Sequence, residues 1–348
     1  MDARSRTHAV IAATGGPMSA AQGTSTGAGA GSADSAAGRG GDVTPPAGAT
    51  VGWIGTGIMG RSMAGHLLRA GYRVVVHSRT RSKAEHLLAE GATWADSPAA
   101  AAAGADFVCL NVGLPDELDA VCFGPGGIFD TLRAGSVVID FGTSRPSAAR
   151  RMAARAAERG ATALDAPVSG GDVGARNAAL SIMVGGDPSA FARAEPLFAR
   201  LGKTVVHHGD AGSGQRVKIV NQVLVAANTL GMCEALSFGA SAGLDPQRVL
   251  ASVGGGAAAS WSISVLAPRV IGGDFEPGFI VEHMLKDLRI AREEAAELGL
   301  SLPLVDLCVA RYEALVAAGY GRKGTQGIYL LYRDGGGTGG SSTGPGGR

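Results

Sequence analysis

The sequence has few cysteines and few charged residues, and each shortage excludes a class of protein. The four cysteines, Cys109, Cys122, Cys233 and Cys308, lie far apart and form no C-x-x-C pair. This spacing argues against a zinc site or a disulfide framework and fits a reducing cytosol, with each thiol a small buried apolar side chain. The net charge is +1 and 18% of the residues are charged, so the chain lacks the basic patch that nucleic-acid binding needs.

Long uninterrupted apolar runs are also missing. No stretch of about 18 apolar residues stands out as a membrane span. The most apolar long stretch, Ile219 to Met232, contains Asn221, Gln222 and Asn228, and we interpret it as a buried helix of a soluble protein. The apolar stretch His8 to Thr14 is too short for the core of a secretory signal, so we expect a cytoplasmic protein.

Both ends of the chain lack large apolar side chains. Residues 1–48 consist mainly of Gly, Ala, Ser and Thr, and residues 335–348 are rich in Gly and Ser. Such segments cannot bury enough apolar surface to offset the entropy lost on ordering, so we predict that both are disordered.

Glycine, in contrast, is abundant, and one set of glycines has a specific spacing. Gly55, Gly57 and Gly60 form a G-x-G-x-x-G array between an apolar strand pattern and a helical pattern, and a second strand pattern follows. In a dinucleotide site the first glycine permits a tight turn, the second lets a pyrophosphate approach the backbone, and the third lets the helix pack close to the strand. The helix N-terminus attracts the phosphates. The predicted cofactor contacts here are Gly55, Gly57, Ile58, Met59 and Gly60.

The periodicity of the sequence indicates two domains. From about residue 49 to residue 212, apolar strand patterns alternate with helical patterns, which predicts an α/β domain with a mostly parallel, doubly wound sheet of the Rossmann type. From residue 213 to residue 334 only helical patterns occur, beginning with a long one over Ser213 to Ala242 and interrupted by a loop around Pro268 and Pro277. We therefore expect an all-α substrate and oligomerisation domain after Gly212.

The end of the second strand bears on the choice of cofactor. NAD-binding folds place an Asp or Glu there for the ribose 2′-hydroxyl, but this chain has Ser78, Arg79 and Thr80. A guanidinium and hydroxyls can bind a 2′-phosphate, which a carboxylate would repel. We therefore predict NADP as the cofactor, with NAD as a possible substitute. An ordinary solvated charge run would explain the same residues.

Lys218 stands one turn into an otherwise apolar helix. Burial of a lysine is costly unless the lysine has a use, and Asn221 and Gln222 follow on the same helix face. Partial desolvation would lower the pKa of Lys218 toward neutrality, which suits proton transfer to or from a substrate hydroxyl. The alternative is a lysine that extends from the helix start to water.

A glycine loop follows a predicted strand at Asp165-Ala-Pro-Val-Ser-Gly-Gly171. The carboxyl ends of strands line the ligand crevice of an open α/β sheet. Ser169, with the backbone N–H groups of Gly170 and Gly171, could hold a carboxylate. Because the loop suits one carboxylate, we expect a small acid of about three to five carbon atoms. A plain glycine turn is the alternative.

Four motifs in order give the chain a family resemblance. They are VGWIGTGIMG, then DAPVSGGDVGARNAALSIMVGGD, then GSGQRVKIVNQ, then FEPGF followed by KDL. With these motifs the chain resembles the β-hydroxyacid dehydrogenases, a family that includes 3-hydroxyisobutyrate dehydrogenase and tartronate semialdehyde reductase. The resemblance runs from about Val51 to Asp334.

The resemblance implies an oxidoreductase that interconverts a small β-hydroxy acid and its semialdehyde or keto form. It implies Lys218 as the catalytic residue and the loop from Ser169 to Gly171 as the carboxylate site. It also implies substrate contacts from Asn221 and Gln222, and cofactor contacts from Thr143, Lys286 and Asp287. No metal is implied, and a homodimer or homotetramer is expected.

Three departures from the family pattern bear on substrate and cofactor contacts. The family often has Met-Leu-Pro where Val112-Gly-Leu-Pro115 stands, and usually a glycine where Ala178 stands. Its Asp-x-Ser-Thr reads Asp140-Phe-Gly-Thr143 here. Two rival functions remain at this point: reduction of an imine or another carbonyl, against which Lys218 argues, and a catalytically silent nucleotide-binding scaffold.

Overall fold

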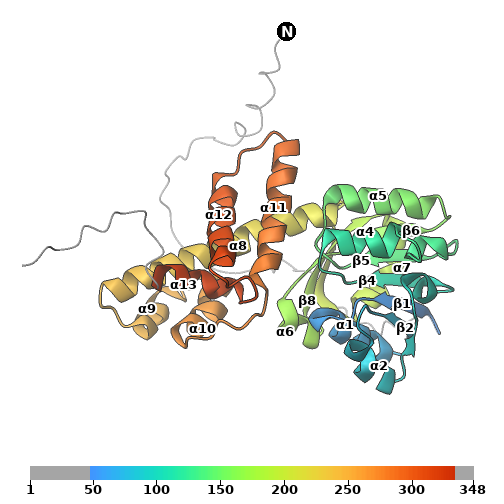
Figure 1. The fold of residues 1–348 in the computed structure, drawn as a ribbon, viewed down its shortest axis with the longest axis horizontal. Coiled ribbons are helices and arrows are strands. Elements are labelled where there is room, and N and C mark those ends of the chain that lie inside the picture. The colour runs from blue at the N-terminus through green and yellow to red at the C-terminus, as the bar shows by residue number, and fades with distance from the viewer. Residues whose placement is uncertain (1–47, 334–348) are drawn as a thin grey trace, which may run out of the picture. The chain divides into compact units, whose positions relative to one another are not determined.

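The computed structural model describes residues 48–333, which belong to one compact unit (Figure 1). The terminal segments predicted to be disordered lie outside the described residues, apart from Gly48. As expected, the first described part is an α/β sheet domain and the second is helical.

Six strands form a parallel sheet in the order β3-β2-β1-β4-β5-β6. This order is typical of doubly wound dinucleotide-binding folds, in which the chain starts in the middle of the sheet and builds outward in both directions. The strands are β1 (Thr50–Ile54), β2 (Arg73–His77), β3 (Thr93–Trp94), β4 (Phe107–Leu110), β5 (Val137–Asp140) and β6 (Thr162–Asp165).

Beyond β6 the sheet changes direction. β8 (Leu180–Gly186) runs antiparallel to β6, β9 (Gly202–His207) runs parallel to β8, and the short β7 (Val168–Ser169) runs antiparallel to β8. Only β7 and the short helix α6 (Gly171–Arg176) separate β6 from β8. A parallel pairing would need a longer crossover connection, so β8 returns in the opposite direction.

Helices cover both faces of the parallel strands. Side chains of β1 show how the two apolar layers form: Val51 and Trp53 point into one core cluster and Ile54 into the other, as the period of two predicts. The covering helices are α1 (Ile58–Arg69), α2 (Glu85–Ala89), α3 (Pro98–Ala102), α4 (Pro115–Phe123), α5 (Pro146–Ala157) and α7 (Pro188–Phe198), with 3₁₀ turns at Arg81–Ala84 and Ile128–Asp130.

The helical part begins with α8 (Ser213–Ser241), against which α11 and α12 pack (Figure 1). The expected loop around Pro268 is wrong, because a π-helical turn at Ser262–Leu266 runs directly into α10 and Pro268 lies in the first turn of α10. The helix tolerates a proline there because the π-helical turn just before it already departs from the i→i−4 bonding that the proline N–H would otherwise continue. The other helices are α9 (Pro246–Val253), α10 (Ala267–Ile271), α11 (Val281–Glu297), α12 (Pro303–Ala317) and α13 (Ile328–Arg333), with a 3₁₀ turn at Thr325–Gly327.

By length and hydropathy alone, α8 could cross a membrane, and it is the one such helix among the described residues. It nevertheless carries four polar side chains that are almost fully buried: Gln215, Lys218, Gln222 and Thr229. Its partners are strands of the sheet and helices α11 to α13. These contacts are those of a core helix in a folded domain.

Candidate functional site

The glycine turn lies between β1 and α1, at the carboxyl end of the central strand. Gly55 has a φ of 100°, and a Cβ atom there would lie 2.3 Å from the carbonyl oxygen of Asn111. A Cβ atom at Gly60 would lie 2.1 Å from the carbonyl oxygen of Gly55. Both positions therefore require glycine for close packing of the backbone.

Gly57 differs from its two neighbours in the motif. Its φ is −66°, and a Cβ atom there would meet nothing within 4 Å. The described protein atoms therefore give no reason for a glycine at this position. Thr56, beside it, is 1% exposed, and its Oγ1 has no hydrogen-bond partner among the described residues. An open approach to the backbone and an unsatisfied hydroxyl at a helix N-terminus fit the pyrophosphate of a dinucleotide.

The three residues after β2 lie at the surface next to this turn. Arg79 is 83% exposed, and its Nη1 lies 2.7 Å from Oε1 of Glu117 in the first turn of α4. The other oxygen of Glu117 accepts a hydrogen bond from the backbone N–H of Gly113 at 3.1 Å. Glu117 thus connects the end of β2 to the loop that follows β4. This pairing was not predicted from the sequence.

Lys218 is buried in the second turn of α8. It is 6% exposed, and within residues 48–333 its ammonium makes neither a hydrogen bond nor an ion pair. Burial lowers the pKa of Lys218 to about 8; the nearby Asp287 carboxylate opposes this change and the Lys286 ammonium adds to it. The side chain of Lys218 is therefore almost wholly covered by protein, and near neutral pH it can both give and take a proton.

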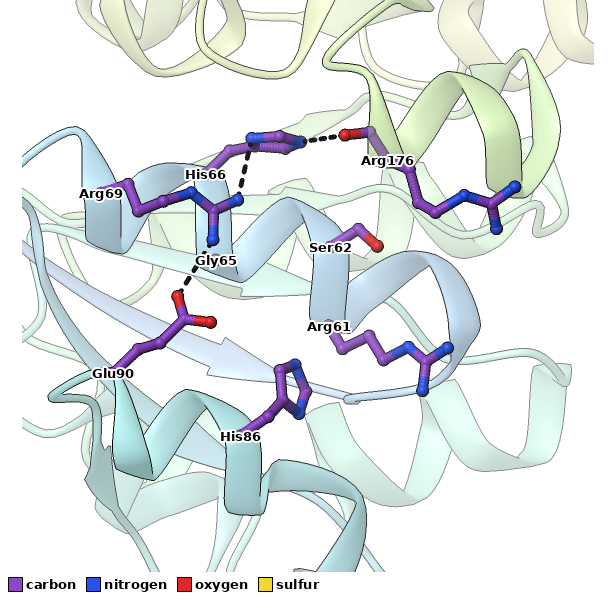
Figure 2. Close-up of a pocket in the computed structure, with 8 residues that line it drawn as sticks. All are labelled: Arg61, Ser62, Gly65, His66, Arg69, His86, Glu90 and Arg176. Carbon is purple, nitrogen blue, oxygen red and sulfur yellow. Dashed lines mark hydrogen bonds and ion pairs between the residues drawn. The ribbon is translucent and has the colours of Figure 1, made fainter.

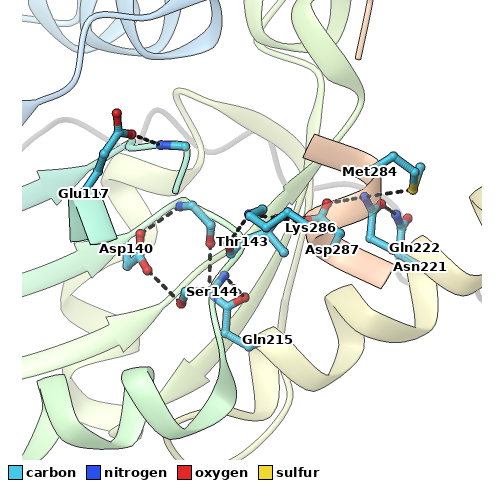
Figure 3. Close-up of polar contacts among 12 residues, drawn as sticks. Glu117, Asp140, Thr143, Ser144, Gln215, Asn221, Gln222, Met284, Lys286 and Asp287 are labelled. Carbon is cyan, nitrogen blue, oxygen red and sulfur yellow. Dashed lines mark hydrogen bonds and ion pairs between the residues drawn. The ribbon is translucent and has the colours of Figure 1, made fainter. Parts of the chain in front are cut away.

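The residues predicted with Lys218 form one chain of polar contacts (Figure 3). Asn221 donates to Gln222 Oε1 at 2.7 Å, and Gln222 Nε2 donates to Asp287 Oδ2 at 2.5 Å. Lys286 Nζ lies 2.9 Å from the other oxygen of Asp287 and donates to the carbonyl oxygen of Thr143 at 2.6 Å. Gln222 is 3% exposed and holds Asn221 in place through its side chain.

The loop after β5 carries Thr143 and is held by a buried carboxylate. Asp140 Oδ1 accepts from the N–H of Gly142 at 2.8 Å, and Oδ2 accepts from the hydroxyl of Ser144 at 3.2 Å. Burial raises the pKa of Asp140 to about 7, although both hydrogen bonds act in the opposite direction. Asp140 thus contacts the residues on both sides of Thr143, Gly142 through its backbone and Ser144 through its hydroxyl.

The predicted carboxylate loop begins within β7 and ends in a helix. Ser169 is the last residue of β7, Gly170 has a φ of 125° as the N-cap of α6, and Gly171 has a φ of 62°. The sequence predicts a glycine loop after a strand here, and the structure adds β7 before the glycines and α6 after them. The two positive φ values require glycine and turn the chain from the sheet into α6. α8 packs against β7 and β8.

A histidine on α1 holds the far end of α6 (Figure 2). His66 Nε2 lies 2.9 Å from the carbonyl oxygen of Ala175 and 3.1 Å from that of Arg176, while Arg69 Nη2 lies 3.2 Å from Nδ1. Carbonyl oxygens only accept and a guanidinium only donates, so Nε2 carries the proton. The adjacent pocket of about 360 Å³ is lined by none of the predicted site residues.

Ala178, which replaces the usual family glycine, has a φ of 49°. It is the one non-glycine residue with a positive φ among residues 48–333. Left-handed backbone costs an alanine about 1–2 kcal/mol. The departure seen in the sequence therefore stores strain in the segment between α6 and β8.

Two models of protein families match consecutive parts of the chain. Residues 50–209 match the NAD-binding domain of 6-phosphogluconate dehydrogenase, and residues 212–332 match a domain described as the NAD-binding part of NADP-dependent 3-hydroxyisobutyrate dehydrogenase. The first match covers the sheet domain with its glycine turn, and the second begins just before α8. The chain belongs to the β-hydroxyacid dehydrogenase family.

The relatives of this chain match it over most of its length. The uncharacterized oxidoreductase YkwC of Bacillus subtilis is 46% identical over 81% of this chain and 98% of its own. The probable 3-hydroxyisobutyrate dehydrogenase-like 1, mitochondrial, of Arabidopsis thaliana is 44% identical over 83% of this chain and 86% of its own. The 2-hydroxy-3-oxopropionate reductase of Escherichia coli is 38% identical over 77% and 92%.

Solved structures agree with the fold of this chain. The 3-hydroxyisobutyrate dehydrogenase of Mycobacterium tuberculosis with L-serine is 29% identical, with a TM-score of 0.75 over 82% of this chain and 99% of its own. Psf3, in complex with NADP+ and 2-OPP, is 27% identical with the same TM-score over 81% and 99%. The chain is thus an NAD(P)-dependent oxidoreductase of the 3-hydroxyisobutyrate dehydrogenase type.

Proposed function

We propose that the protein interconverts a small β-hydroxy acid and its semialdehyde or keto form with NADP(H), and that Lys218 is the general acid and base. One observation carries the proposal. Lys218 is buried, its pKa is lowered to about 8, and within the described residues no partner occupies its ammonium. A buried ammonium whose donors are free is suited to a substrate oxygen.

The chain's own residues divide the work. The N–H groups of Gly170 and Gly171, with the Ser169 hydroxyl, bind the carboxylate. Lys218 hydrogen-bonds the hydroxyl group of the acid and takes its proton during oxidation; during reduction it returns a proton to the carbonyl oxygen. Thr143, Lys286 and Asp287 would hold a bound nicotinamide, which would supply the hydride-transfer chemistry at the carbon that carries this oxygen. Asn221, oriented by Gln222, provides a second polar contact for the substrate.

For the cofactor we propose NADP(H) over NAD(H). Arg79 would meet the 2′-phosphate, and Ser78 and Thr80 would add hydroxyl donors. One charge-assisted bond contributes roughly 1.5–3 kcal/mol, which is about tenfold in affinity or more. Glu117 limits the preference, because it pairs with Arg79 and would repel the phosphate. The other cofactor contacts are the glycine turn, Thr143, Lys286 and Asp287.

We propose a class of small carboxylic acids as substrates. The relatives named above act, by their names, on hydroxyisobutyrate-type acids or on 2-hydroxy-3-oxopropionate. These acids have one carboxylate, and the carbon that is oxidised or reduced lies two bonds from the carboxylate carbon. We therefore propose an acid of about three to five carbon atoms, the size that suits one carboxylate loop.

We also propose a homodimer or homotetramer in the cytoplasm. Val220, Leu224 and Phe238 on α8 are 59%, 58% and 73% exposed, and Trp261 is 61% exposed. Apolar side chains at such exposure on a long helix are typical of an interface. Light scattering at micromolar concentration should therefore give a mass above the 34.7 kDa of one chain.

The experiment is a substrate panel with both cofactors. NADPH or NADH absorbance would be followed with β-hydroxy acids, the matching semialdehydes, their esters, and cyclic imines. We expect turnover of the acids and semialdehydes, better kcat/KM with NADPH, and no comparable turnover of esters. Efficient ester turnover would contradict the carboxylate loop. Preferred imine turnover would favour an imine reductase, and no turnover of any compound would favour a silent scaffold.

For the 2′-phosphate contact, the variant is Arg79→Asp. The introduced carboxylate would repel the phosphate, so NADPH use should fall and the preference should move toward NADH. Equal use of both cofactors by the wild type, or unchanged NADPH use by the variant, would contradict the proposal.

A further inference from the structure

Gln215 lies in the first turn of α8, one turn before Lys218, and is completely buried. Its side chain reaches out of the helix to the loop after β5. Gln215 Nε2 donates to the carbonyl oxygen of Gly142 at 2.9 Å, and Gln215 Oε1 accepts from the N–H of Ser144 at 3.0 Å. The two bonds are made to the residues before and after Thr143, and Figure 3 shows Gln215 facing this loop.

The backbone of Gln215 is held independently of its side chain. Asp165, at the end of β6 and 1% exposed, accepts from the N–H of Gln215 at 2.8 Å and from that of Gly212 at 2.7 Å. A carboxylate in this place satisfies N–H groups that the start of a helix leaves without partners. The first turn of α8 is therefore anchored to the sheet.

Close backbone packing anchors the same turn a second time. A Cβ atom at Gly214 would lie 2.3 Å from the carbonyl oxygen of Met183, and one at Gly185 would lie 2.7 Å from the N–H nitrogen of Gly214. The first turn of α8 thus has little freedom to move on β8. Lys218, three residues after Gln215, is carried on this fixed turn.

We propose that Gln215 is a positioning residue that fixes the loop Gly142–Ser144, and with it the cofactor contact at Thr143, at a set distance from Lys218. The inference rests on the function proposed above. The hydride is exchanged at a carbon atom of the substrate and the proton at the oxygen bonded to it. The cofactor and Lys218 must therefore be held at a fixed distance from each other. A glutamine is suited to this task, because its amide both donates to Gly142 and accepts from Ser144.

The first test compares Gln215→Met with Thr229→Val. Thr229, also completely buried on α8, donates to the carbonyl oxygen of Val225 at 2.8 Å and serves as the matched control for loss of a buried polar group. We expect Gln215→Met to lower kcat by about tenfold to a hundredfold, the effect of a shift on the order of 1 Å. The KM for the acid should change little, because the Ser169 loop is untouched. Thr229→Val should keep wild-type kinetics.

The second variant, Gln215→Glu, gives a signature that a merely structural role would not. Above the pKa of the introduced carboxyl, the carboxylate cannot donate to Gly142 and repels its carbonyl oxygen. Below that pKa, the protonated carboxyl restores both bonds. Relative to wild type at the same pH, kcat of this variant should therefore recover as the pH is lowered. This arm also keeps the proposal testable if Gln215→Met folds poorly.

A third arm separates this inference from the proposed function. In the Lys218→Met background, Gln215→Met should no longer lower turnover further, but it should still weaken NADPH binding measured by fluorescence. If Lys218→Met alone retains turnover, the proposed function fails. If Lys218→Met is inactive while Gln215→Met and Gln215→Glu both turn over at the wild-type rate, Gln215 is only a core residue and this inference is overturned.

Discussion

The glycine turn before α1 and the first turns of α8 are two helix starts built in different ways. Before α1 the backbone alone makes the structure, and Gly55 and Gly60 are required because other backbone atoms lie within 2.3 Å of where a Cβ would stand. In α8 the glycines only anchor the helix, and the chemistry depends on the buried side chains of Gln215, Lys218 and Gln222. Gln215 and Gln222 contact distant parts of the chain, and Lys218 lies between them on the helix.

The difference concerns how each site can be altered. A site made of backbone N–H groups keeps these groups when a side chain is replaced. A substitution can block such a site or strain its backbone, but it does not remove the groups that bind. A side-chain site depends on single functional groups whose removal is specific.

Removal of the lysine should have the largest effect. Lys218→Met keeps the length and apolar stem of the side chain but loses the ammonium, and kcat should fall by on the order of 10²-fold or more, the contribution of a general acid and base. The dissociation constant for NADPH, measured by fluorescence titration, should stay within a factor of about two of the wild-type value, which corresponds to about 0.4 kcal/mol in binding free energy. Near-normal turnover would show that proton transfer does not depend on the Lys218 ammonium at the start of α8.

Two alanine variants in the glycine turn sharpen the backbone half of the comparison. Gly57→Ala adds a methyl group into open space, so the melting temperature should not change while NADPH affinity falls by about tenfold, or 1.4 kcal/mol. Gly60→Ala forces its methyl group against Gly55 and should destabilise the fold by about 1–3 kcal/mol. Calorimetry and NADPH titration would distinguish them. A destabilised Gly57→Ala with normal affinity would contradict the phosphate role of this position.

Glu117 adds a side-chain contribution to the backbone site. Glu117→Gln removes the competitor for Arg79, so NADPH should bind more tightly, by up to about fivefold, since an exposed ion pair contributes about 0.2–1 kcal/mol. NADH affinity should be unchanged because it lacks the 2′-phosphate. Weaker NADPH binding in Glu117→Gln would mean that Glu117 orients Arg79 for the phosphate instead of competing with it.

The smallest effect is expected at Ala178. Ala178→Gly removes about 1–2 kcal/mol of left-handed strain, while the greater freedom of glycine in the unfolded chain costs about 0.5–1 kcal/mol. The variant should therefore be more stable by at most about 1.5 kcal/mol in denaturant unfolding. A loss of stability would show that the alanine methyl group makes contacts worth more than its strain.

The sequence predicted the sheet domain, the glycine turn and the start of α8 at Ser213, because periodicity and glycine spacing are local signals. It also singled out Lys218, since a lone charge in an apolar helix is visible in the sequence, but the spacing did not decide between a buried lysine and one that extends to water. It did not show the partners of Gln215, Gln222 or Glu117. The partners of Gln215 lie 71 and 73 residues away along the chain. Asp287 lies 65 residues from Gln222, and Arg79 lies 38 residues from Glu117. Such pairs depend on the tertiary fold, and a single sequence carries no trace of them.

The pH profile of the wild type tests the central claim most directly. Lys218 must be neutral to take a proton, so kcat/KM for oxidation should rise with pH and level off above about 8, the lowered pKa of Lys218. It must be charged to give a proton, so kcat/KM for reduction should fall above the same pH. The residual activity of Lys218→Met should show neither inflection. A wild-type profile without an inflection near pH 8 in either direction, or an unchanged inflection in Lys218→Met, would contradict the assignment of Lys218 as acid and base.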